Sequence, residues 1–204
     1  MSTNQRALSV PELAGKTCLV TGASRGLGVT IARRLAQAGA RVAVHYRQAA
    51  DAAEALCAEL TATGATALPF QADLLDERAF DRLVVAVTAQ LGAIDVLVNN
   101  VGPYVDTPFL DLPLADFDAV MAGNVRATFL LAQAVGGAMR ARHAGRIINI
   151  AATDYRHRSH AVYGLAKSGV VYLTEALALE LAPSTPVLAI APDLIADNED
   201  MAPE

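Results

Sequence analysis

Long apolar runs and cysteines are scarce in this chain of 204 residues. No uninterrupted stretch reaches the roughly 18 apolar residues that a membrane-spanning helix needs. The first ten residues, MSTNQRALSV, lack the apolar core of a signal peptide. The two cysteines, Cys18 and Cys57, fall in a predicted strand and a predicted helix, so we expect buried thiols and not a disulfide framework. Together these absences predict a cytoplasmic protein without membrane contact.

Charge is also sparse, because only 18% of the residues are charged and the net charge is −5 at pH 7. A mildly acidic chain has no general attraction to nucleic acid or to an anionic membrane, so we expect neither as a partner. No set of His, Cys and carboxylate residues has the spacing of metal ligands, which predicts no bound metal. The hydrophobic fraction of 53% is ample for the core of one compact domain.

Short apolar segments alternate with helix-like segments along the chain. Strands are predicted at 17–22, 41–46, 65–73, 94–100, 146–152 and 186–192, and helices at 28–39, 49–63, 75–91, 116–143 (continuous or broken) and 161–182. The strands are apolar throughout, as expected when helices cover both faces of a sheet. Repeated βα units therefore predict an α/β fold with a Rossmann-type doubly wound parallel sheet. Residues 1–15 are expected to form a lead-in, and residues 16–204 a single domain.

A glycine-rich turn follows the first predicted strand. In TGASRGLG the glycines are Gly22, Gly26 and Gly28, spaced GxxxGxG and not as the commoner GxGxxG. Glycine permits a tight strand-to-helix turn and lets a pyrophosphate approach the backbone N–H groups at a helix N-terminus. The turn is either a plain βα connection or a dinucleotide site, and its place before the first helix favours the second.

The end of the second strand indicates which dinucleotide is bound. A carboxylate there would hold the ribose 2′-hydroxyl of NAD. The strand instead ends in His45, Tyr46 and Arg47, with no carboxylate before Asp51, and Arg25 adds a second cation from the glycine turn. Because arginine binds phosphate in a bidentate manner, the two guanidiniums suit a 2′-phosphate. We predict NADPH over NADH; the alternative is that both arginines are solvated surface charges.

Tyr163 and Lys167 lie four residues apart in YGLAK, within the last predicted helix. Residues one turn apart leave the same face of a helix as neighbours. A phenol with a pKa near ~10 is a poor acid at neutral pH, but an ammonium beside it favours the phenolate and lowers that pKa. The pair is therefore a candidate proton-transfer device, although the same spacing alone also fits an ordinary helix surface.

Taken together, the motifs resemble the short-chain dehydrogenase/reductase family, in its common subtype of NADP-dependent ketoreductases. TGASRGLG is similar to the cofactor turn of that family, and Asp73 in QADL to the residue that contacts the adenine. NNVG at 99–102 matches the fourth-strand signature with Val101 in place of alanine, and Asn124 in GNVRATF matches the helix asparagine. The resemblance covers about residues 13–195. It implies an oxidoreductase that uses NADP(H) to reduce a carbonyl or related C=N group on a small molecule.

The resemblance also implies roles for individual residues. Tyr163 would donate a proton to the carbonyl oxygen as hydride arrives from the nicotinamide. Lys167 would hold the nicotinamide ribose and acidify Tyr163, and Asn124 would bind a water that links Lys167 to solvent. The implied cofactor contacts are Gly22, Ser24, Arg25, Gly26, Leu27, Gly28, Tyr46, Arg47, Asp73, Leu74, Asn100, Val101, Gly102, Tyr163, Lys167, Pro192 and Ile195.

The serine that the family places at the end of its fifth strand is missing. Aligned on INI, its position falls on Ala152, and the segment from there to Tyr163 is a couple of residues short. Thr153 is the expected substitute; Asp154 is the alternative, since pterin reductases resembling the family use an aspartate nearby. Losing one such donor typically costs about 10²–10³ in rate. The chain is then a slow reductase, a reductase whose substrate orients itself, or an NADP(H)-binding protein with little turnover.

The match also departs from the family near its end. APDLIADNED retains Pro192 and Ile195, but Asp193 replaces a glycine and no threonine follows. Aspartate tolerates left-handed backbone, so we expect the turn to survive with a weaker hold on the nicotinamide. The sequence ends at Glu204, where the family continues through a substrate-covering loop, a helix and a last strand. We expect either a naturally short protein or, as we favour, part of a longer one.

Two further expectations concern apolar residues. Tyr104 and Phe109, which follow NNVG, either line the substrate cleft or simply pack against the fold. A stripe at a spacing of four in the last helix is expected to face the core: Leu165, Gly169, Leu173, Leu177 and Leu181. By resemblance, the long helices after the fourth and fifth strands pair between subunits, so a homodimer or homotetramer is expected.

Overall fold

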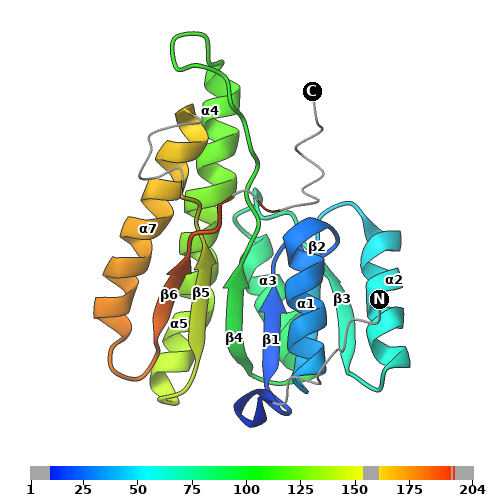
Figure 1. Ribbon diagram of the computed structural model, residues 1–204. Helices are drawn as coiled ribbons and strands as arrows, with labels where there is room; N and C mark the ends of the chain where they lie inside the picture. The colour runs from blue at the N-terminus through cyan, green and yellow to red at the C-terminus, as the bar shows by residue number, and fades with distance from the viewer. Residues whose placement is uncertain (1–9, 154–160, 194, 196–204) are drawn as a thin grey trace.

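The computed structural model of the protein describes residues 10–153, 161–193 and 195. Six parallel strands form one sheet in the order β3-β2-β1-β4-β5-β6 (Figure 1). The strands span Thr17–Val20 (β1), Arg41–Tyr46 (β2), Ala67–Gln71 (β3), Ile94–Asn99 (β4), Arg146–Ile150 (β5) and Val187–Ile190 (β6). The strand order reverses between β1 and β4, and ligands of doubly wound sheets bind beyond the carboxyl ends of strands at such a point. The predicted Rossmann-type α/β fold is confirmed.

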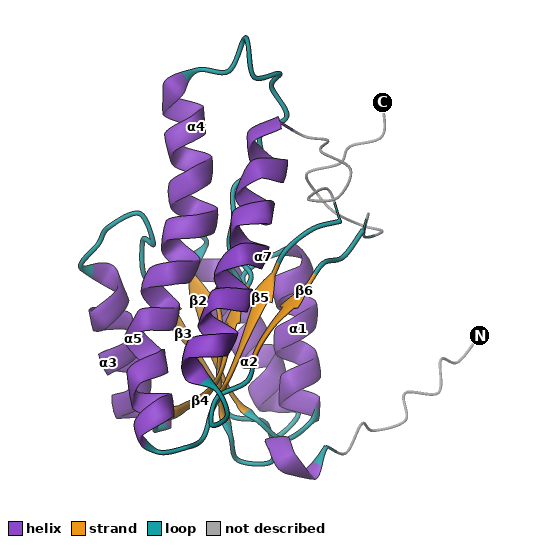
Figure 2. Cartoon of the chain, turned by 90° about the vertical axis from the view of Figure 1, so that its left-hand side faces the viewer, coloured by secondary structure: helices purple, strands orange, loops and turns teal. Residues whose placement is uncertain are grey.

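Helices cover both faces of the sheet (Figure 2). They span Gly26–Gln37 (α1), Ala50–Ala62 (α2), Ala79–Leu91 (α3), Leu114–Met121 (α4), Ala127–Ala141 (α5) and Ala161–Leu181 (α7), with a short 3₁₀ turn at Pro11–Leu13 (η1). On one face, α1 and α2 bury alanine and leucine side chains against β1 and β2. On the other face, α3, α5 and the end of α7 build a larger core around Leu97 and Ile147. The two cores explain why the central strands are apolar on both sides.

The long helix predicted at 116–143 is not broken. A π-helical turn, Ala122–Arg126 (η2), joins α4 to α5 without an interruption of the helical path. A Cβ added to Gly123 would lie 2.9 Å from Cγ of Pro103, so the turn is packed closely against the loop that follows β4. π-turns inside α-helices are frequent at functional sites, and this one carries Asn124.

The third helix begins later than the sequence suggested. Residues 75–78, which were expected to be helical, form a turn because two aspartates accept backbone hydrogen bonds. Asp73 Oδ1 accepts from the N–H of Leu75 at 3.0 Å, and Asp76 Oδ1 accepts from the N–H of Arg78 at 2.9 Å. Short acidic side chains that bond the backbone two residues on favour turns over helix. α3 therefore starts at Ala79.

The leucine stripe expected to face the core in α7 is largely misassigned. Leu165 is 46% exposed, and of the five residues only Leu181 is fully buried. The buried stripe has the same spacing but begins three residues earlier, and it consists of Val162, Ala166, Val170 and Thr174. Small and β-branched side chains occupy it, and Val162 and Ala166 pack with Val120 of α4.

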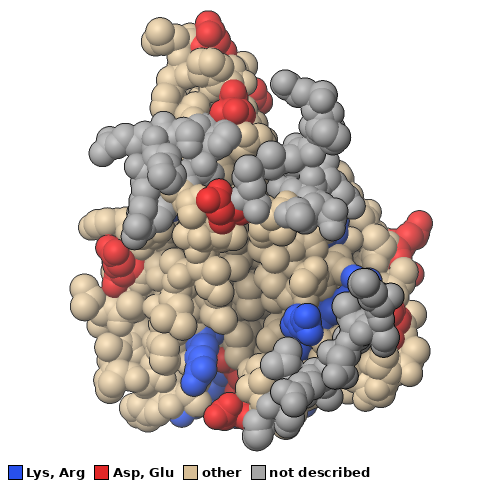
Figure 3. Space-filling model, viewed as in Figure 1, with Lys and Arg blue, Asp and Glu red and all other residues tan. Residues whose placement is uncertain are grey.

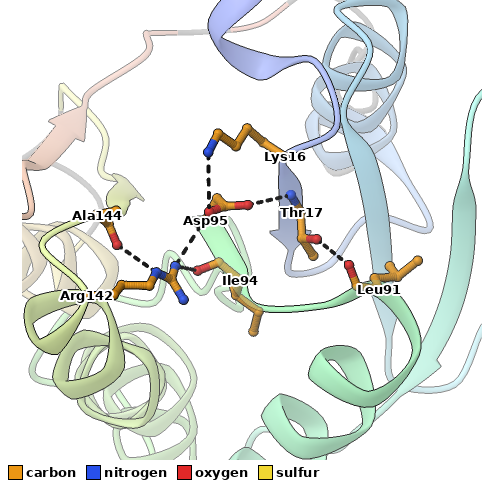
Figure 4. A network of polar contacts seen from close by, with 7 residues as sticks. All are labelled: Lys16, Thr17, Leu91, Ile94, Asp95, Arg142 and Ala144. Carbon is orange, nitrogen blue, oxygen red and sulfur yellow. Dashed lines mark hydrogen bonds and ion pairs between the residues drawn. The ribbon is translucent and has the colours of Figure 1, made fainter.

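A polar network closes the edge of the sheet opposite the strands' carboxyl ends (Figure 4). Asp95 accepts a hydrogen bond from the N–H of Thr17 at 3.0 Å and lies 3.8 Å from Lys16 and 3.7 Å from Arg142. Arg142 also donates to the carbonyl oxygens of Ile94 and Ala144. The network ties β1 and β4 to the loop after α5, and so fixes the start of the strands whose other ends build the site.

β6 is one of the two edge strands of the sheet in the described ranges, and its outer residues are exposed. Leu188 and Ile190 are 52% and 54% exposed, and Tyr172 and Leu179 of the neighbouring α7 are exposed as well. Figure 3 shows this flank, on its left, as largely uncharged surface.

None of the helices in the described ranges combines the length and the apolarity needed to cross a bilayer. Both thiols, Cys18 and Cys57, are free and buried, as predicted.

Candidate active site

The glycine turn connects β1 to α1 at the carboxyl edge of the sheet. Gly22 and Gly26 have φ of +61° and +52°, which other L-residues rarely adopt, and a Cβ on Gly26 would meet no atom within 4 Å. A Cβ on Gly28 would overlap the carbonyl oxygen of Gly22 and lie 2.8 Å from the Cα of Ala23. Arg25, the N-cap residue of α1, makes no side-chain hydrogen bond that caps the helix within the described part of the chain. The start of α1 thus presents backbone N–H groups that its N-cap side chain leaves free, which fits a phosphate.

Thr21 links the NNVG segment, which follows β4, to this turn through hydrogen bonds. Thr21 Oγ1 accepts hydrogen bonds from the N–H groups of Asn100 at 2.9 Å and Val101 at 3.1 Å. Asn100 Nδ2 in turn donates to the carbonyl oxygens of Thr21 at 3.0 Å and Gly22 at 3.3 Å. Val101 closes over Gly22, where a Cβ would lie 2.8 Å from Val101 Cγ2. The four bonds fix the turn at the point where the strand order reverses.

Thr21 is 1% exposed and was not predicted as a residue of the site. A hydroxyl at the end of an otherwise apolar strand was the available signal, because a buried hydroxyl must find a partner.

Tyr46, Arg47, Asp73 and Leu74, which are expected around the adenosine, lie at or just beyond the ends of β2 and β3, and Arg25 precedes α1 in the glycine turn. Tyr46 and Gln71 are paired across these strands, and Gln71 Nε2 donates to the carbonyl oxygen of Arg47 at 3.1 Å. Arg25 and Arg47 are exposed, and neither guanidinium forms an ion pair with another residue in the described ranges. Leu74 is buried next to Asp73. The two arginines are therefore free to bind an anionic group there.

Tyr163 and Lys167 lie on one face of α7, as their spacing predicted. Lys167 is 3% exposed, and its Nζ donates to the carbonyl oxygen of Ile150 at 2.9 Å. The same Nζ lies 5.4 Å from the centroid of the Tyr163 ring. Burial lowers the pKa of Lys167 from 10.5 to about 8, so the side chain is still charged at pH 7. A cation is thus fixed beside a phenol, at the end of β5.

Tyr104 faces Tyr163 from the loop after β4. The two ring centroids are 5.0 Å apart with an interplanar angle of 71°, an edge-to-face contact. The ring of Tyr104 remains 42% exposed, and Phe109, further along the loop, is 57% exposed. Of these two aromatic residues, Tyr104 is the one that contacts Tyr163 within the described ranges.

Asn124 lies fully buried in η2 and is held by two carbonyl groups. Its Nδ2 donates to the carbonyl oxygens of Pro103 and Val120, each at 3.0 Å. Its Oδ1 is buried and has no hydrogen-bond partner among the described residues. A Cβ on Gly102 would lie 2.7 Å from Asn124 Cγ, so the NNVG segment packs directly on the asparagine. No hydrogen bond joins Asn124 to Lys167 within the described ranges, and the implied link between them remains a proposal.

A family model of short chain dehydrogenases matches residues 16–202. The chain belongs to the short-chain dehydrogenase family. A 3-oxoacyl-[acyl-carrier-protein] reductase of Synechocystis is 40% identical over 189 residues, which cover 91% of this chain and 76% of that protein. A D-threitol dehydrogenase of Mycolicibacterium smegmatis is 38% identical over 87% of this chain and 70% of its own length.

Solved structures of dehydrogenases share the fold. A dehydrogenase/reductase from Sinorhizobium meliloti superposes with a TM-score of 0.83 at 36% identity, over 92% of this chain and 74% of that one. A blue fluorescent protein from a metagenomic library, solved in complex with NADPH, superposes with a TM-score of 0.82 at 36% identity, over 88% and 74% of the two chains. Membership of the family makes this chain an oxidoreductase with a nicotinamide cofactor, as the motifs implied.

The short-chain dehydrogenase pattern is nevertheless altered at the end of β5. Ala152 is buried at 7% exposure, where the resemblance places a serine. The backbone is held on both sides, since the N–H groups of Ala151 and Thr153 donate to the carbonyl oxygens of Ile190 and Pro192 at 2.8 and 3.1 Å. Thr153 is partly buried beside it, whereas Asp154 lies outside the described residues.

The remaining predicted cofactor contacts lie in the glycine turn and beyond β6. Ser24 and Leu27 of the turn are half-buried, Pro192 is half-buried, and Ile195 is exposed.

Proposed function

We propose that this short-chain dehydrogenase is an NADPH-dependent reductase of a carbonyl or related C=N group on a small molecule, with Tyr163 as the proton donor. The observation that carries the proposal is the buried ammonium of Lys167, held by Ile150 and 5.4 Å from the Tyr163 ring. A buried cation costs stability, and it is retained here beside a phenol at the edge of the sheet where the glycine turn lies.

When bound, the nicotinamide cofactor supplies the hydride for the substrate carbon. The residues that would hold it are the open turn at Gly22–Gly28, the segment Asn100–Gly102, and Asp73 and Leu74 beyond β3. The turn fits the group because its glycines leave the backbone bare and the N-cap side chain leaves the first N–H groups of α1 free. Lys167 would hold the nicotinamide ribose, and Pro192 and Ile195 would border the nicotinamide.

In the proposed reaction the O–H bond of Tyr163 breaks, and its proton passes to the substrate oxygen as negative charge develops there. The ammonium of Lys167 stabilises the phenolate that remains, because opposite charges attract strongly in a site without water. Asn124 would hold a water that connects Lys167 to solvent and returns the proton to Tyr163. Its buried Oδ1, which has no hydrogen-bond partner among the described residues, is a candidate acceptor for that water.

The preference for NADPH over NADH is supported by Arg25 and Arg47, which are exposed beside the adenosine site and have no ion-pair partner among the described residues. A guanidinium binds a 2′-phosphate in a bidentate manner. We expect the dissociation constant of NADPH to be at least tenfold below that of NADH, since one charged hydrogen-bonded contact contributes about 1.5–3 kcal/mol. Arg47→Asp should reverse the preference, and a ratio near one in the wild-type protein contradicts it.

Ala152 supports a second candidate function, an NADP(H)-binding protein with little or no turnover. The position lacks a hydroxyl, and Thr153 is the substitute that we propose for orienting a substrate carbonyl. NADPH oxidation against a panel of ketones, quinones and pterins separates the two functions, with Tyr163→Phe as the control. Turnover that depends on Tyr163 supports the reductase, whereas tight NADPH binding without turnover on any substrate supports the second function.

We also propose that the protein is a cytoplasmic homodimer or homotetramer. Phe129, at 41% exposure, borders an open groove of about 600 Å³ on the outer side of α4, η2 and α5. Met121, Ala122, Val125 and Phe129 line this groove together, and contiguous apolar surface, unlike single apolar residues, marks sites of protein association. Light scattering at micromolar concentration should give a multiple of the chain mass, and a monomer would contradict the assembly without affecting the reductase proposal.

A further inference from the structure

His45 is a buried polar residue that the reaction does not use. It lies near the end of β2 and is 2% exposed. Both ring nitrogens have partners: Nδ1 lies 3.1 Å from the backbone nitrogen of Gly22, and Nε2 lies 3.0 Å from the carbonyl oxygen of Ala72. The imidazole therefore spans from the glycine turn after β1 to the end of β3.

The two partners determine the state of the ring. The Gly22 N–H can only donate, so Nδ1 must be the unprotonated acceptor. The carbonyl oxygen of Ala72 can only accept, so Nε2 carries the hydrogen. Only the neutral Nε2–H tautomer satisfies both bonds. Burial supports this state because it lowers the pKa of His45 from 6.5 to about 4, against smaller opposing effects of the hydrogen bond to Ala72 and of the Asp73 carboxylate.

The segments that His45 joins are those expected to hold the adenosine half of the cofactor. The backbone of His45 also accepts from the N–H of Ala23 at 2.9 Å, and the N–H of Ala72 donates to the carbonyl oxygen of Tyr46 at 3.0 Å. Ala72 directly precedes Asp73. Thr21 and Asn100 hold the glycine turn on the side of β4, and His45 holds it on the side of β2.

We propose that His45 is a positioning residue for the dinucleotide: its neutral imidazole sets the spacing between the glycine turn and the β3 end so that one ligand can contact both. The inference rests on the proposed function, since it requires that a dinucleotide bind at this edge. It assigns a specific role to Nδ1 as the acceptor that holds Gly22, separate from the role of Nε2 at Ala72.

Two substitutions separate the two bonds. In His45→Asn the amide oxygen replaces Nδ1 and can still accept from Gly22, but the side chain is too short for Ala72. In His45→Gln the amide nitrogen reaches the place of Nε2 and can still donate to Ala72, but no acceptor faces Gly22. His143→Gln is the matched control, because His143 is exposed on the loop between α5 and β5.

Dissociation constants for NADPH, NADH and adenosine 2′,5′-bisphosphate are measured by titration calorimetry, beside urea denaturation of each variant. We expect His45→Gln to weaken NADPH and the bisphosphate roughly tenfold, the effect of one lost hydrogen bond to a buried N–H. His45→Asn should stay within about threefold of wild type, and His143→Gln should be unchanged. A purely structural role would lower the unfolding free energy of both His45 variants and leave both affinities unchanged.

Nitrogen NMR of the wild-type protein gives a second readout that does not depend on how the variants fold. The spectrum of His45 should show the Nε2–H tautomer from pH 7 down to pH 5, and an Nδ1–H or doubly protonated ring at pH 7 overturns the proposal. Equal NADPH affinity in wild type and His45→Gln also overturns it, while leaving the proposed function intact. If wild type binds neither NADPH nor NADH, the proposed function fails and this inference fails with it.

Discussion

Replacing Lys167 by methionine should make the cofactor-free protein more stable while it removes turnover. Burial lowers the pKa of Lys167 from 10.5 to about 8, so carrying its charge in the fold at pH 7 costs about 3 kcal/mol, at ~1.4 kcal/mol per pKa unit. Two contacts offset part of that cost: the hydrogen bond from the ammonium to Ile150 contributes about 1.5 kcal/mol, and the contact with the Tyr163 ring about 0.5 kcal/mol. Methionine has a similar length and no charge, so Lys167→Met should raise the unfolding free energy by about 1 kcal/mol.

The stability difference between wild type and Lys167→Met should change with pH, which a change in packing alone would not cause. Below pH 8 Lys167 is protonated in both the folded and the unfolded state, so the wild-type protein carries the full cost. Between about pH 8 and 10.5 only the unfolded state keeps the proton, so wild-type stability gains on the variant as pH rises.

Urea denaturation of cofactor-free wild type and Lys167→Met at pH 7.0 and 9.5 measures both effects. Lys16→Met is the matched control, since Lys16 is an exposed lysine at the opposite edge of the sheet, and should change stability by less than about 1 kcal/mol. A Lys167→Met protein less stable than wild type at pH 7, or a stability difference that does not change with pH, would refute the reasoning.

Three shorter predictions concern other parts of the site. Gly28→Ala should weaken NADPH binding at least tenfold and destabilise the protein by about 1–3 kcal/mol, because its Cβ would overlap the carbonyl oxygen of Gly22. Calorimetry measures the affinity and urea denaturation the stability; an unchanged NADPH affinity would contradict the prediction. Ala152→Ser should raise kcat by up to about 10² on ketones, in a manner lost when Tyr163→Phe is added; no gain would show that this position does not limit the rate. Folding lowers the pKa of His45 from 6.5 to about 4, so between these pH values only the unfolded state takes up a proton. The unfolding free energy of wild type should therefore fall by about 3 kcal/mol as pH drops through that window, and an equal loss in His45→Asn would contradict this.

The fold could be predicted from the sequence because each strand is a short, wholly apolar segment followed by a helical one. What the sequence could not show was the start of α3 and the π-turn in the long helix. The first depends on Asp73 and Asp76 bonding local N–H groups in competition with helix. The second contains Gly123, on which Pro103 packs, and the local sequence pattern does not show this contact.

The site was predictable where its residues are close in sequence and harder where they are not. The spacing of Tyr163 and Lys167 placed them on one face, but the carbonyl group that holds Lys167 belongs to Ile150, in another element. Thr21 and His45 were missed because a polar residue inside an apolar strand shows its partners only after the strands are paired. The prediction that the leucine stripe of α7 is buried was wrong for a related reason. Sequence spacing shows that residues share a face of the helix, but the neighbouring elements decide which face is buried.

The most direct test of the proposed reaction is single-turnover oxidation of protein-bound NADPH with excess ketone, in wild type and Tyr163→Phe. Loss of nicotinamide absorbance should be at least 10² slower in Tyr163→Phe, which lacks the proton donor, while the dissociation constant of NADPH stays within about threefold. Equal rates in the two proteins, or a Tyr163→Phe protein that fails only in binding NADPH, would contradict the assignment of Tyr163 as the acid.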